Sequence, residues 1–389
     1  MISRRNFLKA GSLAAWMIPS MHPLLKWAID QNPLQIAGED DMIIRSDRFL
    51  DLETPPELLN SWITPVPHFF VRNHMHEPSS LEAQTWQLTI RGEVENPLVL
   101  TLRDLRKMTS HSVLNTLECA GNGRAFHQPH VPGIQWQKGA VGTAKFSGPA
   151  LRDVLQKAGV KANGRHVMFR GLDEIPGKVP PFVRSIPIEK AIDDDTLIAT
   201  HMNGSPLTKH HGFPARALVP GWVGAASCKW LSEITVLEKE FDGFFMKPGY
   251  RYPNHPLKPG DPLNADDSHI LTSLNVKSII VSPTDESLLK SGPLHVRGVA
   301  WAGEADVVKV EISTDSGVTW QLAKLGRDHA KYAWRMWSHS WEPDKPGVYA
   351  IWSRATDSQG RTQPDFAEWN PGGYLYNAID KVKINVQAS

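Results

Sequence analysis

The sequence predicts an α+β protein in which a mixed α/β domain is followed by an immunoglobulin-like β-sandwich. Three observations lead to this fold class. The chain has 389 residues, enough for two or three domains. Strand-like runs are interspersed with short helical segments up to about residue 240, whereas only strand-like runs follow residue 268. The stretch between them, residues 241–268, is rich in proline, as domain linkers often are.

Composition limits the possible functions. The chain carries 42 basic and 41 acidic side chains, so its net charge of +1 favours neither nucleic acid nor a membrane surface as a partner. Its hydrophobic content of 41% is that of a globular protein with a sizeable core. No apolar run approaches the roughly 18 to 20 residues of a membrane span.

The amino terminus predicts a targeting segment over residues 1–37. Residues 3–9 read Ser-Arg-Arg-Asn-Phe-Leu-Lys, and a moderately apolar run follows. This pattern resembles the twin-arginine export signal, whose translocase carries proteins already folded around a cofactor. It implies a periplasmic protein whose first residues serve targeting and do not belong to the folded domains.

The mixed domain is predicted over residues 45–265. Apolar residues alternate at Trp86, Leu88 and Ile90, which indicates a strand with one buried face. Residues 125–148 are rich in glycine and are expected to form a long loop. In chain order, the expected elements are strands over 86–90 and 97–100, a helix from 101, a strand over 112–117, a helix over 149–159, a strand over 166–171, a helix near 185–191, and strands over 197–202, 217–221 and 230–236.

Local signals mark the ends of two of these helices. Thr101 and Asp104 have the spacing of a capping box at a helix start. Gly159 follows an amphipathic segment and is expected to end it.

The second domain is predicted over residues 266–389. Turn signals such as Asp315-Ser316-Gly317 separate short strand-like runs, a spacing typical of an immunoglobulin-like sandwich. The expected strands cover 276–281, 294–300, 307–312, 320–325, 333–341, 347–355 and 382–386.

Cys119 is the residue that most invites a chemical interpretation. It ends a strand-like run and is followed by Ala-Gly-Asn-Gly-Arg, so backbone can approach the thiol closely and Arg124 is near in sequence. A thiolate there would be a nucleophile, a redox group or a soft metal ligand, whereas the plainer alternative is a small buried apolar residue. The chain has one other cysteine, Cys228, and a disulfide between the two is disfavoured.

Four sequence blocks together resemble the sulfite oxidase family of molybdenum enzymes. They are Phe-Val-Arg-Asn-His at 70–74, Glu-Cys-Ala-Gly-Asn-Gly-Arg at 118–124, His-Gly-Phe-Pro-Ala-Arg at 211–216 and Val-Pro-Gly-Trp-Val-Gly-Ala-Ala-Ser-Cys-Lys-Trp at 219–230. The blocks occur in the family's order. The resemblance covers roughly residues 50–389 and implies a molybdopterin-binding domain followed by a dimerisation domain, and hence a homodimer.

This resemblance implies a molybdenum-molybdopterin cofactor with one pterin per metal. Cys119 matches the cysteine that binds molybdenum, and sulfur ligands suit such a metal. His211, Arg216 and Lys229 would supply charge-assisted donors to the cofactor phosphate. The positions that match cofactor contacts are Phe70, Val71, Arg72, Asn73, His74, Asp173, His211, Arg216, Ser227, Cys228 and Lys229.

The family's substrate is a small oxyanion held by arginines. Arg72 and Arg124 match two of them, and Trp136 matches a tryptophan near the pocket, although a plain core role is its alternative. A third arginine comes from the sandwich; Lys331 and Arg335 both resemble it, and Arg335 is taken as the candidate catalytic residue.

Two departures from the family pattern leave the substrate open. Pro132 stands where the vertebrate pattern has a lysine, and Phe241 stands where it has a tyrosine. Tyr250 or Tyr252 is a candidate to replace that tyrosine.

The resemblance therefore implies oxidation of sulfite to sulfate. Alternatives are a sulfane dehydrogenase of thiosulfate oxidation, a molybdenum reductase of sulfoxides or other oxyanions, and a cofactor-free binding protein. The sequence contains no Cys-x-x-Cys-His haem motif, so no haem is expected in this chain. Electrons are then expected to pass to a separate protein, a periplasmic cytochrome c.

Overall fold

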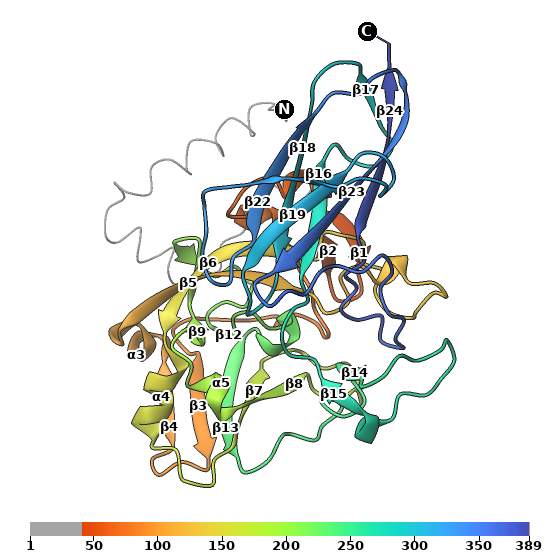
Figure 1. Cartoon of the computed structure of the whole chain (residues 1–389). Coiled ribbons are helices and arrows are strands. Elements are labelled where there is room, and N and C mark those ends of the chain that lie inside the picture. Colours follow the sequence, from red (N-terminus) through yellow and green to blue (C-terminus); the bar gives the residue numbers. More distant parts are fainter. Residues whose placement is uncertain (1–40, 389) are drawn as a thin grey trace, which may run out of the picture.

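The computed structural model describes residues 41–388, and strands make up most of its regular structure (Figure 1). Within those residues the α-helices are α3 (Leu102–Lys107), α4 (Leu151–Ala158) and α5 (Ile188–Ala191). None of them is long and apolar enough to cross a membrane. These are the three helices predicted for the mixed domain, although strands outnumber them. The predicted export signal at residues 1–37 lies outside the described residues.

The larger sheet of the first unit has five strands in the order β4-β3-β13-β7-β8. β13 runs parallel to β3, and the other neighbours are antiparallel. The strands are β3 (Gln87–Gly92), β4 (Leu98–Thr101), β7 (His166–Gly171), β8 (Val183–Pro187) and β13 (Leu231–Leu237).

Helix caps follow the sequence signals. The Thr101 side chain accepts a hydrogen bond from the backbone N–H of Asp104, and the Asp104 carboxylate accepts one from the backbone N–H of Thr101, which confirms the capping box of α3. Gly159 ends α4 in the left-handed conformation with φ of 69°, as predicted. Both helices bury their apolar face against the first unit's core.

A second sheet carries the strand that leads to Cys119. Its order is β11-β10-β6-β5, and all its neighbours are antiparallel. The strands are β5 (Ser110–Glu118), β6 (Val141–Pro149), β10 (His201–Met202) and β11 (Ser205–Pro206).

The presence of β6 corrects the long loop predicted over residues 125–148. Its glycines are sites of close packing rather than turns. A Cβ on Gly142 would lie 2.7 Å from the Phe69 ring, and one on Gly148 would lie 2.1 Å from the backbone oxygen of Ile198. Composition alone does not distinguish these two uses of glycine.

Three short strand pairs complete the first unit and the linker. Each is antiparallel. They are β1 (Ile43–Ser46) with β2 (Asp51–Glu53), β9 (Leu197–Ala199) with β12 (Arg216–Leu218), and β14 (Arg251–Pro253) with β15 (Ser268–Ile270).

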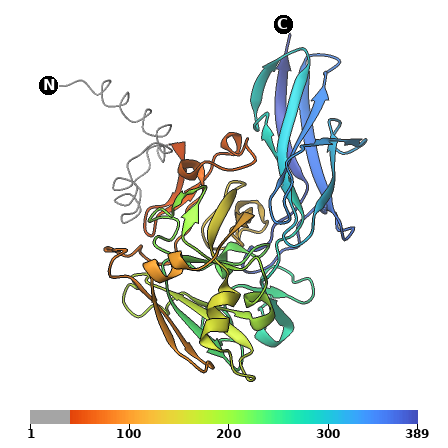
Figure 2. The same cartoon turned by 90° about the vertical axis from the view of Figure 1, so that its left-hand side faces the viewer.

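The second unit consists of two sheets around one apolar core, with the carboxyl terminus at its far tip (Figure 2). The sheet orders are β16-β18-β22-β21 and β17-β24-β23-β19-β20. Two facing sheets agree with the predicted sandwich, whose immunoglobulin-like class stays a prediction. The strands are β16 (Lys277–Ser282), β17 (Ser287–Lys290), β18 (Leu294–Trp301), β19 (Val307–Ser313), β20 (Gln321–Leu322), β21 (Lys324–Leu325), β22 (Arg335–Trp341), β23 (Gly347–Asp357) and β24 (Asp380–Gln387).

β5 lies against the second unit, so the strand that ends at the site is held by both. The backbone N–H of Thr116 donates to the Tyr332 carbonyl at 2.8 Å, and the Thr116 hydroxyl accepts from the backbone N–H of Trp334 at 2.8 Å. The indole of Trp334 donates to the Trp62 carbonyl, and the Trp62 indole donates back to the Trp334 carbonyl. These contacts fix β5 relative to the sandwich.

Gly148→Ala tests the packing role of the glycines in β6. The added methyl group would collide with the Ile198 carbonyl, and overpacking of this kind costs about 1–3 kcal/mol. A lower urea midpoint is expected for this variant, whereas Ser147→Ala, which removes only an exposed hydroxyl contact with Ser112, should shift it little. Equal midpoints for the two variants would contradict the packing role.

Candidate functional site

Cys119 sits just beyond the end of β5, in a turn held by backbone hydrogen bonds. Its N–H donates to the Ala140 carbonyl at 2.9 Å, and its own carbonyl accepts from the N–H of Asn122 at 2.9 Å. The Asn122 side-chain oxygen accepts from the N–H of Ala140 at 3.1 Å. The thiol is free and buried, and these contacts fix its backbone on both sides.

The glycines of the turn make room for two large side chains. A Cβ on Gly121 would lie 2.5 Å from the Arg124 guanidinium. Gly123 has φ of 99°, and a Cβ there would lie 2.7 Å from Tyr376. The Ala-Gly-Asn-Gly-Arg sequence therefore lets the Arg124 side chain fold back over the turn that follows Cys119.

Glu118 anchors the turn to the second unit. Its carboxylate accepts from Lys277 Nζ at 3.0 Å and from the Trp301 indole N–H at 2.8 Å, both residues of the sandwich. It also accepts from the Asn122 amide at 2.9 Å. Glu118 and Lys277 are both buried. The residue before Cys119 is thus held by an ion pair that spans the two units.

A cavity extends from Cys119 into the first unit, and we call it the inner cavity. It gathers residues from all four sequence blocks that resemble the molybdenum family. The predicted cofactor residues among its lining are Phe70, Arg72, Asn73, His74, Asp173, His211, Arg216, Ser227, Cys228 and Lys229, together with Cys119.

Val71 is the one predicted cofactor residue outside the inner cavity. Its side chain packs with Met42 and Leu52, and its backbone pairs with Leu52. Neighbouring side chains in extended backbone point to opposite sides, so Phe70 and Arg72 face the cavity while Val71 faces away.

Arg216 and Lys229, together with Arg72, are the cations in the wall of the inner cavity. Arg216 donates to the carbonyls of His211 and Ser227, while its buried Nε has no partner within residues 41–388. Lys229 Nζ donates to the Asn73 side-chain oxygen and to the His210 carbonyl. Burial lowers the pKa of Arg216 to about 10 and that of Lys229 to about 8, so both are mostly charged at neutral pH. A buried guanidinium with an unused donor suits an anion.

Two histidines of the inner cavity, His74 and His211, are neutral. Burial, with Lys229 and Arg216 nearby, lowers the pKa of His211 to about 3. Burial and the Arg72 cation lower the pKa of His74 well below its ordinary value. His74 Nε2 shares a hydrogen bond with the Tyr250 hydroxyl. These rings offer hydrogen bonds rather than charge.

A second, wider cavity opens from Cys119 towards solvent, and we call it the outer cleft. Its volume is about 590 Å³. Arg72 and Arg124 lie at its base beside Cys119. Burial raises the pKa of the Cys119 thiol, and the two guanidiniums oppose that rise. Cations on this side of the thiol favour a thiolate and an anionic ligand.

The two arginines of the outer cleft are held differently. Arg72 pairs with the buried Asp51 at 3.2 Å. Arg124 donates from Nε to the Gly372 carbonyl at 3.0 Å and from Nη1 to the Ile134 carbonyl at 2.8 Å. Among the described residues, no carboxylate accepts a hydrogen bond from Arg124, so its positive charge is not neutralised by such a partner.

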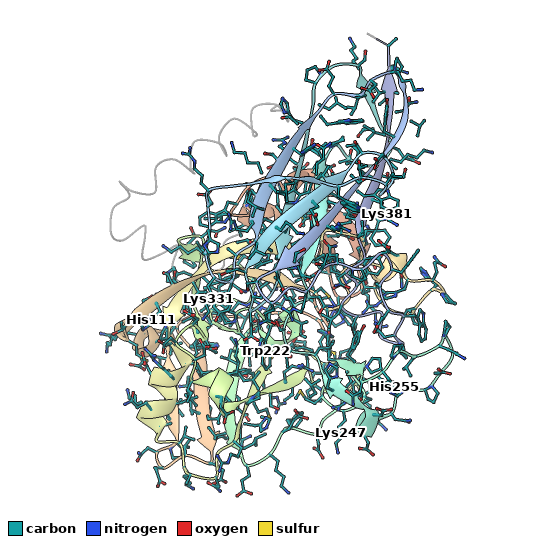
Figure 3. The ribbon with its side chains drawn as sticks, in the orientation of Figure 1. His111, Trp222, Lys247, His255, Lys331 and Lys381 are labelled. Carbon is teal, nitrogen blue, oxygen red and sulfur yellow. The ribbon has the colours of Figure 1, made fainter. Side chains whose placement is uncertain are left out.

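The other predicted substrate residues lie away from both cavities. Trp136 is fully buried in the first unit's core. Arg335 lies on β22 and donates to the Gly326 carbonyl. Lys331, which Figure 3 labels, is exposed and pairs with Asp195. The sandwich therefore brings neither Arg335 nor Lys331 to Cys119.

Three further residues line the site, and the sequence pointed to one of them, Tyr250, but not to Tyr374 or Asp51. Tyr250 borders both cavities, whereas Phe241 and Tyr252 border neither within the described chain. Tyr374 comes from the segment after β23 and stacks on Tyr250 with ring centroids 5.3 Å apart. Asp51 comes from β2. The family pattern has a tyrosine where this chain has Phe241, and that difference pointed to Tyr250. No local sequence signal marks Tyr374 or Asp51.

Two family models match the chain. The model described as "Oxidoreductase molybdopterin binding domain" matches residues 74–245. The model described as "Mo-co oxidoreductase dimerisation domain" matches residues 268–387. The blocks at 211–216 and 219–230, which supply Arg216 and Lys229, lie inside the first match.

Similar proteins include sulfite oxidases and one solved sulfane dehydrogenase. "Sulfite oxidase, mitochondrial" of Mus musculus is 37% identical over 88% of this chain and 65% of its own length, so the chain spans about two thirds of that relative. "Sulfite oxidase" of Arabidopsis thaliana is 32% identical over 85% of this chain and 91% of its own length. The crystal structure of the sulfane dehydrogenase SoxCD from Paracoccus pantotrophus superimposes with a TM-score of 0.77 at 26% identity, covering 96% of this chain and 94% of that one.

The ion pair between Glu118 and Lys277 yields a stability prediction. Lys277→Met would leave a buried carboxylate without its cation, which should lower the free energy of unfolding by about 3–5 kcal/mol. The double variant Glu118→Gln/Lys277→Met should recover at least half of that loss, because the amide still accepts from Trp301. Strictly additive losses in chemical denaturation would show that the two residues do not act as a pair.

Proposed function

We propose that this chain, which belongs to the sulfite oxidase family of molybdopterin-binding oxidoreductases, oxidises sulfite to sulfate at Cys119. One observation carries the proposal: the thiol lies where the inner cavity meets the outer cleft, with Arg72 and Arg124 beside it. A cofactor in the inner cavity and an anion in the outer cleft would meet at that sulfur.

The residues of the inner cavity fit a molybdopterin. Cys119 would ligate the metal, and the unused Nε of Arg216 together with Lys229 would bind the cofactor phosphate. The neutral His211 and His74 would hydrogen-bond to the pterin. When bound, the cofactor supplies two-electron oxidation and accepts oxygen derived from water.

The protein's own part is to bind and orient the anion. The Arg124 guanidinium would hold a sulfite oxygen through its remaining N–H groups, since Nε and Nη1 are fixed by the Gly372 and Ile134 carbonyls. Arg72 is fixed in turn by Asp51. Arginines anchored in this way lose little freedom when the substrate binds, which favours a defined approach of the sulfur lone pair.

The proposal also includes the electron acceptor, the cellular location and the oligomeric state of the protein. Oxidation of sulfite releases two electrons, and a periplasmic cytochrome c would take them singly. The twin-arginine pattern of residues 3–9 supports export of the folded protein through the twin-arginine translocase. The match of residues 268–387 to a dimerisation domain supports a homodimer.

A sulfane dehydrogenase is the second candidate, because SoxCD shares the fold over 96% of this chain. Thiosulfate and sulfite, each tested with ferricyanide and then with cytochrome c, separate the two. Sulfite as the preferred substrate supports the proposal, and turnover of thiosulfate without sulfite oxidation would replace it with the second candidate.

Cys119→Ser is expected to abolish sulfite oxidation. An alcohol is a poor ligand for a metal that prefers sulfur, so the rate should fall by at least a thousandfold. The measurement is the sulfite:ferricyanide rate per bound molybdenum, with metal and pterin content determined on the same preparation. Wild-type turnover in a variant that retains its molybdenum would refute the assignment.

Arg124→Gln is expected to raise the Michaelis constant for sulfite at least tenfold. One charged contact of about 1.4 kcal/mol corresponds to that factor. Arg103→Gln, which removes an exposed arginine of α3, is the matched control and should leave the constant unchanged. A Michaelis constant unaffected in Arg124→Gln would remove this residue from the substrate site.

A further inference from the structure

The outer cleft is larger and more apolar than sulfite requires. Its volume of about 590 Å³ lies in the range of pockets for drug-sized ligands. Above the arginines its wall is formed by apolar and aromatic side chains, with the Phe244 ring 51% exposed. The residues of this apolar wall are Phe49, Pro132, Ile134, Phe244, Phe245 and Pro371. A bare oxyanion would leave this wall without a role.

The outer cleft is lined by arginines, and its charge favours an anion. Arg72 is paired with Asp51, whose side chain is 1% exposed. Arg124 donates to the Gly372 and Ile134 carbonyls, so its charge is available to an anion beside Cys119. Arg48, which lies over the Phe49 ring, and Arg251, which is bonded to the 265–268 turn, add further positive charge to the cleft.

An aromatic surface continues from the base to the opening. The rings of Tyr250 and Tyr374 stack nearly parallel, at 14° and 5.3 Å between centroids. Phe244 and Phe245 meet edge to face at 5.1 Å. Rings arranged in this way offer faces and edges on which a flat apolar group packs well. The cleft thus joins one cationic end to a continuous aromatic wall.

We propose that the outer cleft admits organic sulfinates, R–SO₂⁻ with an aromatic R group, and that the same site oxidises them to sulfonates. A sulfinate has the sulfur lone pair of sulfite and one negative charge, and its R group replaces the third oxygen. The charged end would face Arg124 while R packs on the wall formed by Ile134 and Phe244. This inference rests on the proposed sulfite chemistry and extends its substrate class.

The proposed reaction balances without a further reactant. One water supplies the oxygen of the new S–O bond, and two protons pass to solvent. Sulfur loses two electrons, which leave singly to two equivalents of the same one-electron acceptor that serves sulfite. The R–S bond stays intact throughout.

Kinetics on the cofactor-loaded protein test this inference. With ferricyanide as acceptor, kcat/KM should be at least tenfold higher for benzenesulfinate than for methanesulfinate, because only the former reaches the aromatic wall. Phe244→Ser should reduce kcat/KM for benzenesulfinate at least fivefold and change that for sulfite less than twofold. Phe366→Ser removes a ring that is 82% exposed and lies outside the outer cleft, so it should change neither value.

Calorimetry provides a readout that does not depend on turnover. Benzenesulfonate should bind at least tenfold more tightly than methanesulfonate, and Phe244→Ser should abolish most of that preference. Sulfite turnover without benzenesulfinate turnover, or an equal effect of Phe244→Ser and Phe366→Ser, would overturn the inference and leave the proposed function intact. Failure of sulfite itself to react would instead contradict the proposed function.

Discussion

The buried ion pair between Glu118 and Lys277 is the interaction on which the site depends. Glu118 directly precedes Cys119, and its carboxylate is bound by Lys277 and Trp301 of the sandwich. Removing charges from water is expensive, and close pairing with further hydrogen bonds offsets that cost only when the geometry is good. The sandwich therefore fixes the position of the thiol, although it contributes no charged side chain to either cavity. It is a structural part of the site.

The two cavities that meet at Cys119 differ in their chemistry. The inner cavity combines buried cations with neutral histidines, such as Arg216, which donates to the backbone carbonyl of the neutral His211. The outer cleft combines one neutralised arginine, Arg72, with the freer Arg124 and an aromatic wall. Such a division suits a resident phosphate-bearing group on one side and an exchanging anion on the other. Cys119 lines both cavities, together with Arg72, His74 and Tyr250.

The sequence was most informative where function is encoded in short local blocks. Cys119, Arg72 and Arg124 were identified from two such blocks, and the structure brings them together. Contacts between distant segments could not be predicted in this way. Tyr374 reaches the cleft from the segment between β23 and β24, and nothing near it in the sequence signals this. The glycines of β6 misled the secondary-structure prediction, because close packing and turns both favour glycine. Trp136 and Arg335 matched the family pattern yet lie in a core and on a sandwich strand.

The central claim is that the Cys119 sulfur binds molybdenum in the assembled protein. Molybdenum X-ray absorption spectroscopy of protein isolated from its native compartment measures this directly, because it counts sulfur neighbours of the metal. If the Cys119 sulfur binds the metal, molybdenum in Cys119→Ser should have one sulfur neighbour fewer than in the wild-type protein. An unchanged number of sulfur neighbours in a variant that retains its molybdenum would contradict it.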